Sequence, residues 1–318
     1  MGADFDNNPQ RRLRRSLAAV ALNCVLAAGN AAAGSILFIG NSFTFAGGSP
    51  LRYYRPGTVT DLNGDGNGGV PALFKSFTVQ AGLKYDVYLE TQPGVSLDWQ
   101  ADHKLGVIGR HAWDVVVMQG YNTLEPTKPE NVAVLSAGVR QLAEFFRAKN
   151  PAVELRLMAT WSRADETYPP KGAWYGKPIE AMARGVRAGY EQAGKGTPGI
   201  KSVLPVGEAW TRAMHAGVAD PNPYDGIDDG KIDLWAGDNF HASTYGYYLE
   251  ALVVFGAVTG RDPRSLGDGE CSAFELGLSP AKVGALQQVA FDQLAAEGAI
   301  QAAPRNSSVS SAPARCPR

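Results

Sequence analysis

A serine, a histidine and an aspartate in this sequence could together carry out nucleophilic acyl transfer. Ser42 stands in the turn Gly40-Asn41-Ser42, directly after the apolar run SILFI at 35–39. A serine hydroxyl becomes an effective nucleophile when a base accepts its proton and a carboxylate orients that base. Of the four histidines, at positions 103, 111, 215 and 241, only His241 has a carboxylate three residues before it, at Asp238. The pattern predicts Ser42 as nucleophile, His241 as general base and Asp238 as the orienting carboxylate.

The turn around Ser42 has two other interpretations. It could bind a phosphate, but it lacks the G-x-G-x-x-G spacing of a dinucleotide turn and the Gly-Lys-Ser/Thr ending of a phosphate loop. Ser42 could also be a plain helix N-cap, and His241 a helix-start residue without a role. The presence of Asp238 three residues before His241 favours the nucleophile.

Acyl transfer also needs hydrogen-bond donors for the oxyanion that develops at the carbonyl. "TQPGVSLDW" puts Gly94 at a turn, and "VVVMQGYNT" puts Asn122 after another apolar run. We expect the oxyanion donors to be the Ser42 backbone, Gly94 and the amide of Asn122, with Gln119 as a rival to Asn122. A turn glycine and a turn or cap asparagine are the alternative interpretations.

Short strand-like runs alternate with helix-like stretches along the chain, which is typical of a parallel sheet with right-handed crossovers. Strands are predicted at 35–39, 85–90, 114–118, 154–160 and 202–206, and helices at 70–81, 132–149, 178–192, 243–258 and 280–296. In such a sheet the working loops follow the carboxyl ends of the strands. Ser42, Gly94 and Asn122 all stand at such ends.

These motifs together resemble the SGNH hydrolases, also called GDSL-type esterases and lipases. That superfamily carries a serine after strand one, a glycine after strand two, an asparagine after strand three and D-x-x-H near the C-terminus. Here Gly-Asn-Ser-Phe replaces Gly-Asp-Ser-Leu, and Thr123 replaces the Asp of G-x-N-D. The resemblance covers about residues 35–260. It implies an α/β fold, a flavodoxin-like three-layer α/β/α sandwich with about five parallel strands, and serine ester hydrolysis without a catalytic cofactor.

The segments MATWSRADETYP, VLPVGEAW and DNFHASTYGYYLEALVVFGAVTG look like those of an exported bacterial subgroup that includes carbohydrate acetylesterases. No long aliphatic run lies on the predicted strand-end loops, so the expected substrate is a short acyl ester, most simply an acetyl group, on a small molecule or polysaccharide. Lipid, aryl or polyester esters are the alternatives, as is a non-catalytic binding protein on the same fold.

A long loop at about 46–69 and the residues after the fourth strand could line a substrate cleft. Aromatic side chains there could stack on sugars, although ordinary packing would explain them equally well. The candidate substrate-binding residues are Tyr53, Tyr54, Trp161 and Arg163.

The same loop contains D-L-N-G-D-G, the first half of a calcium loop, in which Asp61, Asn63 and Asp65 would be ligands. The twelfth position is Ala72 and not glutamate, so an ordinary EF-hand is excluded. A structural Ca²⁺ site and a solvated turn are both consistent with this pattern.

The N-terminus has the pattern of a secretory signal. RRLRR at 11–15 precedes an Ala-rich apolar stretch that ends at Ala33. We expect residues 1–33 to be a signal peptide, 34–300 a hydrolase domain without a membrane span, and 301–318 a disordered tail. The protein would then be periplasmic or secreted, where Cys271 and Cys316 could pair or stay as thiols. A net charge of −1 and the lack of a basic block beyond the N-terminus argue against a nucleic-acid partner.

Overall fold

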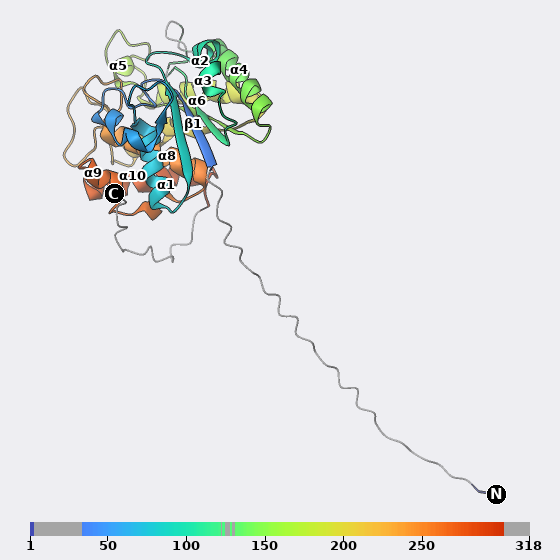
Figure 1. Cartoon of the computed structure of the whole chain (residues 1–318). Coiled ribbons are helices and arrows are strands. Elements are labelled where there is room, and N and C mark those ends of the chain that lie inside the picture. Colours follow the sequence, from blue (N-terminus) through green and yellow to red (C-terminus); the bar gives the residue numbers. More distant parts are fainter. Residues whose placement is uncertain (3–33, 122, 125–127, 129–130, 302–318) are drawn as a thin grey trace. The chain divides into compact units, whose positions relative to one another are not determined.

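A six-stranded parallel sheet forms the framework of the chain (Figure 1). The computed structural model describes residues 1–2, 34–121, 123–124, 128 and 131–301. The strands are β1 (Gly34–Gly40), β2 (Thr60–Asp61), β3 (Tyr85–Thr91), β4 (Val115–Met118), β5 (Glu154–Ala159) and β6 (Ile200–Pro205), in the spatial order β2-β3-β1-β4-β5-β6. All neighbouring strands run parallel.

Helices cover both faces of the sheet, so the α/β fold predicted from the sequence is confirmed. Because side chains alternate along a strand, Ile36 and Phe38 of β1 enter one core and Leu37 and Ile39 enter the other. The first core is closed by α1 (Gly69–Gln80), α7 (Val206–His215), α8 (Thr244–Thr259) and α10 (Pro280–Ala296); the second is closed by α2 (Leu97–His103), α4 (Ala133–Lys149) and α6 (Glu180–Lys195). Figure 1 shows α1, α8 and α10 on one side of β1 and α2 and α4 on the other.

The helices α2 and α7 were not predicted from the sequence, and neither were the remaining elements, which are short. They are the helices α3 (Leu105–Ile108), α5 (Ala164–Thr167) and α9 (Cys271–Glu275), and the 3-10 turns Pro50–Tyr53, Pro56–Thr58 and Pro263–Leu266. The 46–69 loop, expected to lack secondary structure, contains two of these turns and the edge strand β2.

The strand register places three turns side by side. Gly40 of β1 pairs with Thr91 of β3, and Ile39 pairs with Met118 of β4. The carboxyl ends of the three central strands therefore lie at one edge of the sheet, as the site requires.

Several predictions fall wholly or mostly outside the described residues. These are the signal segment 1–33, Asn122 and, after Gln301, the tail; they remain predictions. The described residues from Gly34 to Gln301 belong to one compact unit. Cys271 is disulfide-bonded, and the other two cysteines of the chain, Cys24 and Cys316, both lie outside the described residues. No helix in the described part is long and apolar enough to cross a membrane.

Candidate active site

The structure brings Ser42, His241 and Asp238 into one hydrogen-bonded chain. The distance from His241 Nε2 to Ser42 Oγ is 2.9 Å, and His241 Nδ1 lies 2.6 Å from Asp238 Oδ2. With Nδ1–H donating to the carboxylate, Nε2 presents its lone pair to the serine hydroxyl. This is the arrangement in which an imidazole can take the proton of an attacking serine.

Asp238 uses its two carboxylate oxygens for different tasks. Oδ1 accepts the backbone N–H groups of Phe240 and His241 at 3.0 and 2.9 Å, while Oδ2 accepts the imidazole. Burial would raise the pKa of Asp238, but the hydrogen bonds from the His241 ring and from these N–H groups outweigh it and lower the pKa below its usual value. The carboxylate therefore stays ionised beside the imidazole.

Helix α8 begins three residues after His241, with Ser243 as its N-cap, and ends the loop. The Ser243 hydroxyl caps α8 by accepting the N–H of Gly246 at 3.3 Å, and Ser243 Oγ donates to the carbonyl of Asp233. One turn into the helix, the buried Tyr247 hydroxyl lies 2.8 Å from the Gly47 carbonyl and 3.2 Å from the Ser42 carbonyl. The helix that follows the base thus also anchors the turn that carries the nucleophile.

Asn41 links the three turns at the sheet edge, a role that the sequence analysis missed. Its Nδ2 donates to the carbonyls of Val95 at 3.0 Å and Gly120 at 3.1 Å, and its Oδ1 accepts the N–H of Phe43. A carboxylate could not donate to two carbonyls, so the asparagine of Gly-Asn-Ser has a structural reason here. The sequence feature that could have indicated this role is the position of Asn41 between Gly40 and Ser42.

Two glycines are required by close packing around the nucleophile. A Cβ at Gly40 would stand 2.1 Å from Thr44 Oγ1. A Cβ at Gly47 would stand 2.7 Å from Ser42 Cβ and 3.2 Å from His241 Nε2. The backbone of Gly47 therefore lies directly against the serine and histidine.

The structure describes two of the three predicted oxyanion donors, the backbone N–H groups of Ser42 and Gly94. Within the described part of the chain, the N–H groups of Ser42 and Gly94 donate to no acceptor. Gly94 follows β3 with a φ of 68°, a conformation that favours glycine. Gln119, the rival donor, does not fit: it is buried, its Oε1 accepts the Asn41 N–H and the Thr44 hydroxyl, and its Nε2 donates to the Gly120 carbonyl. Gln119 supports the turn instead.

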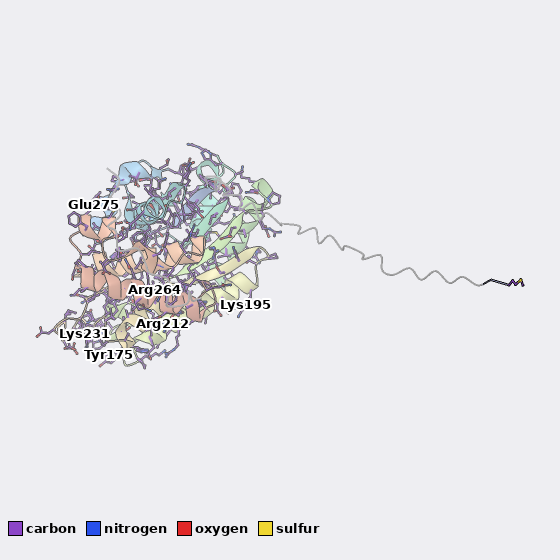
Figure 2. The ribbon with its side chains drawn as sticks, turned by 90° about the horizontal axis from the view of Figure 1, so that it is seen from below. Tyr175, Lys195, Arg212, Lys231, Arg264 and Glu275 are labelled. Carbon is purple, nitrogen blue, oxygen red and sulfur yellow. The ribbon has the colours of Figure 1, made fainter. Side chains whose placement is uncertain are left out.

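Two of the four predicted substrate-binding residues are buried, and those predictions are wrong. Trp161 has no exposed surface, stacks on Trp210 with ring centroids 4.5 Å apart, and belongs to the core below the site. Tyr54 is 8% exposed, and its hydroxyl donates to Glu275, labelled in Figure 2, at 2.7 Å. Tyr53, 64% exposed, remains available for a ligand.

The side chain of Arg163, the fourth candidate, is 17% exposed and pairs with Asp165 and Glu166. Its guanidinium therefore already has anionic partners and is not an uncompensated cation for a substrate.

The predicted calcium loop does not fit a calcium ion. The two Asp61 oxygens accept the N–H groups of Asn63 and Asn67, both at 3.0 Å. The ammonium of Lys104 lies 2.8 Å from Asn63 Oδ1 and 3.0 Å from a carboxylate oxygen of the buried Glu90. A lysine thus supplies the positive charge at this place. No group of three or more His, Cys, Asp or Glu side chains that could hold a metal occurs among the described residues.

Comparison with solved structures agrees with this fold. A DUF4886 family protein from Bacteroides uniformis superposes with a TM-score of 0.54 at 17% identity, covering 82% of this chain and 95% of that one. A "putative GDSL-like lipase" from Parabacteroides merdae superposes with a TM-score of 0.51 at 18% identity, covering 71% and 95%. No protein-family model and no curated protein matches the sequence. At these identities the likeness concerns the fold alone: the chain shares the α/β fold of these two proteins.

Proposed function

We propose that the protein is a serine ester hydrolase. The observation that carries the proposal is the hydrogen-bonded chain from Ser42 Oγ through the His241 ring to Asp238 Oδ2, with distances of 2.9 and 2.6 Å. A binding protein on this fold would not require these three side chains in this order.

In the proposed reaction Ser42 Oγ attacks the ester carbonyl carbon while His241 Nε2 takes the hydroxyl proton. The carbonyl oxygen becomes an oxyanion, for which the unpaired N–H groups of Ser42 and Gly94 are the proposed donors, together with the Asn122 amide. The C–O bond to the alcohol then breaks, and His241 returns the proton to the leaving oxygen. Water, activated by His241, hydrolyses the acyl-serine and restores the hydroxyl.

We propose a short acyl group, with acetyl as the simplest, and a carbohydrate as the alcohol. In residues 41–60 and 91–96, which include the serine turn and the turn after β3, the leucine and phenylalanine side chains are buried, and the two valines, Val59 and Val95, are half-buried. A long acyl tail would therefore find little aliphatic surface there. Tyr53 is exposed in the same loop and has the Arg52 guanidinium 5.3 Å from its ring centroid, which makes it a platform for a sugar ring.

We also propose that the chain works outside the cytoplasm. The signal-like segment ending at Ala33 supports export, and a disulfide at Cys271 is consistent with an oxidising compartment.

A panel of esters tests this proposal. We expect hydrolysis of p-nitrophenyl acetate and of acetylated xylan or glucose, with kcat/KM falling gradually from acetyl through butyryl and octanoyl to palmitoyl esters of one alcohol. A maximum at octanoyl or longer would refute the short-acyl proposal but keep the esterase. Equal rates for wild type and folded Ser42→Ala would refute the nucleophile.

A further inference from the structure

The segment after β5 holds the Asp238–His241 loop through contacts that join residues more than seventy positions apart. The Asp165 N–H donates to the Asn239 carbonyl at 3.1 Å, and Trp161 Nε1 donates to the Phe240 carbonyl at 3.3 Å. These bonds fix the backbone on the amino-terminal side of His241. Asn239 has a φ of 55°, so the loop adopts a backbone conformation that few residue types favour.

The same segment reaches the catalytic imidazole through a chain of contacts from Arg163 to Phe240 to His241. The Arg163 guanidinium carbon lies 3.9 Å from the centroid of the Phe240 ring. The centroids of Phe240 and His241 are 4.1 Å apart, with an interplanar angle of 43°. Phe43, from the nucleophile turn, lies 5.6 Å from His241 and 5.2 Å from Phe240 between ring centroids. The half-buried Phe240 ring thus contacts both the guanidinium and the imidazole.

Arg163 is itself held in place. Its Nε lies 3.0 Å from Asp165 Oδ1, its Nη2 also contacts Asp165 Oδ2, and Glu166 lies 3.4 Å away. Asp165 is the residue whose N–H bonds the Asn239 carbonyl. The arginine is therefore fixed by the residue that also fixes the loop.

We propose that Arg163 is a positioning residue for His241. Resting on the proposed ester hydrolysis, it acts by pressing Phe240 against the imidazole and so keeping Nε2 aligned with Ser42 Oγ. In this proposal Arg163 does not bind the substrate, although substrate binding was the role expected from the sequence. Without it Phe240 would gain room to turn, and the imidazole would lose one of the surfaces that limit its rotation.

Arg163→Ala and Phe240→Leu test this positioning, and the chain offers a matched control. Arg264, labelled in Figure 2, also lies over a phenylalanine, Phe291, at 3.2 Å and pairs with an aspartate two residues away, Asp262. It follows the far end of α8 from His241, so Arg264→Ala removes the same kind of stack away from the site. Phe240→Leu keeps the Arg163–Asp165 pair and serves as the second variant if Arg163→Ala does not fold.

We expect Arg163→Ala and Phe240→Leu to lower kcat for p-nitrophenyl acetate about 10- to 100-fold, since small misplacements of reacting groups have effects of this size. KM should change less than about twofold, because the interaction lost is not with the substrate. The low-field proton resonance of the His241 Nδ1–H···Asp238 bond should broaden or vanish in both variants and persist in Arg264→Ala.

A raised KM with unchanged kcat would overturn the proposal in favour of substrate binding, and unchanged kinetics would overturn it as well. If the wild type hydrolyses no ester, the proposed function fails. The resonance then decides the positioning role separately: its loss in Arg163→Ala supports the role, and its retention overturns it.

Discussion

At the scale of single residues, the account depends on the two oxygens of Asp238. One oxygen shapes the loop by accepting backbone N–H groups, and the other orients the imidazole. At this position the carbonyl of an asparagine could still accept the backbone N–H groups. Its NH₂ group, however, would face His241 Nδ1, which also carries a hydrogen. The substitution therefore separates folding of the loop from orientation of the base.

We predict that Asp238→Asn lowers kcat by about 10³–10⁴ without unfolding the protein, because the imidazole is then held in the wrong tautomer. The measurement is steady-state hydrolysis of p-nitrophenyl acetate with circular dichroism of the same samples. Asp233→Asn is the matched control, since among the described residues the side-chain carboxylate of Asp233 accepts only the Trp235 N–H. A folded Asp238→Asn enzyme with full activity would contradict the assignment.

The oxyanion donors give a second prediction at this scale. If the Asn122 amide completes the set formed with the Ser42 and Gly94 N–H groups, Asn122→Ala should lower kcat by about 10²–10³ with little change in KM. Initial rates across substrate concentrations separate the two constants. An altered KM with normal kcat would assign Asn122 to substrate binding instead.

At the scale of elements, α8 carries a buried carboxyl that the proposed chemistry does not use. Glu250 is fully buried, and neither of its oxygens has a hydrogen-bond partner in the described part of the chain. Burial raises the pKa of Glu250 well above its ordinary value, so the folded protein holds the carboxyl protonated.

We predict that Glu250→Gln makes the protein more stable than the wild type, and increasingly so as the pH rises. Above the ordinary pKa of 4.5 the unfolded chain releases this proton while the folded chain keeps it. Wild-type stability therefore falls by up to about 1.4 kcal/mol per pH unit until the folded pKa is passed. Urea unfolding at pH of about 5 and about 8 measures the difference. Glu144→Gln, an exposed change on α4, is the control, and a pH-independent difference would contradict the prediction.

The sequence predicted the long elements well because their patterns are strong. All five predicted strands and all five predicted helices are present, since each combines an apolar run or stripe with clear ends. The two-residue β2 is too short to form a pattern, and its place at the sheet edge comes from pairing with β3. Trp161 was misjudged because position along the chain cannot show that its ring turns below the sheet edge and stacks on Trp210.

At the scale of the whole molecule, the order of the motifs along the chain predicted a common site because all strands of the sheet run parallel. Strands that all end at one edge bring Ser42 and Gly94 together, whatever separates them along the chain. The linking role of Asn41 and the Arg163–Phe240 stack could not be predicted, because each depends on side chains from segments that only the tertiary packing brings together.

The disulfide at Cys271 gives a prediction for the whole chain. Cys271 begins α9, and Glu275 at the end of α9 accepts the Tyr54 hydroxyl of the 46–69 loop. Reduction should lower the melting temperature by several degrees, since a native disulfide typically contributes about 2–4 kcal/mol. Thermal unfolding with and without reductant checks this, and peptide mapping without reduction identifies the partner. An unchanged melting temperature after verified reduction would count against a stabilising bridge.

The central claim is that Ser42 is the nucleophile, and covalent labelling tests it most directly. A fluorophosphonate reacts with a serine whose hydroxyl is activated by a neighbouring base, and peptide mass mapping locates the adduct. We predict one adduct, on Ser42, that is absent from Ser42→Ala, strongly slowed in His241→Ala and unchanged in Ser35→Ala at the other end of β1. Labelling of another serine, or ester hydrolysis that persists in folded Ser42→Ala, would contradict the account.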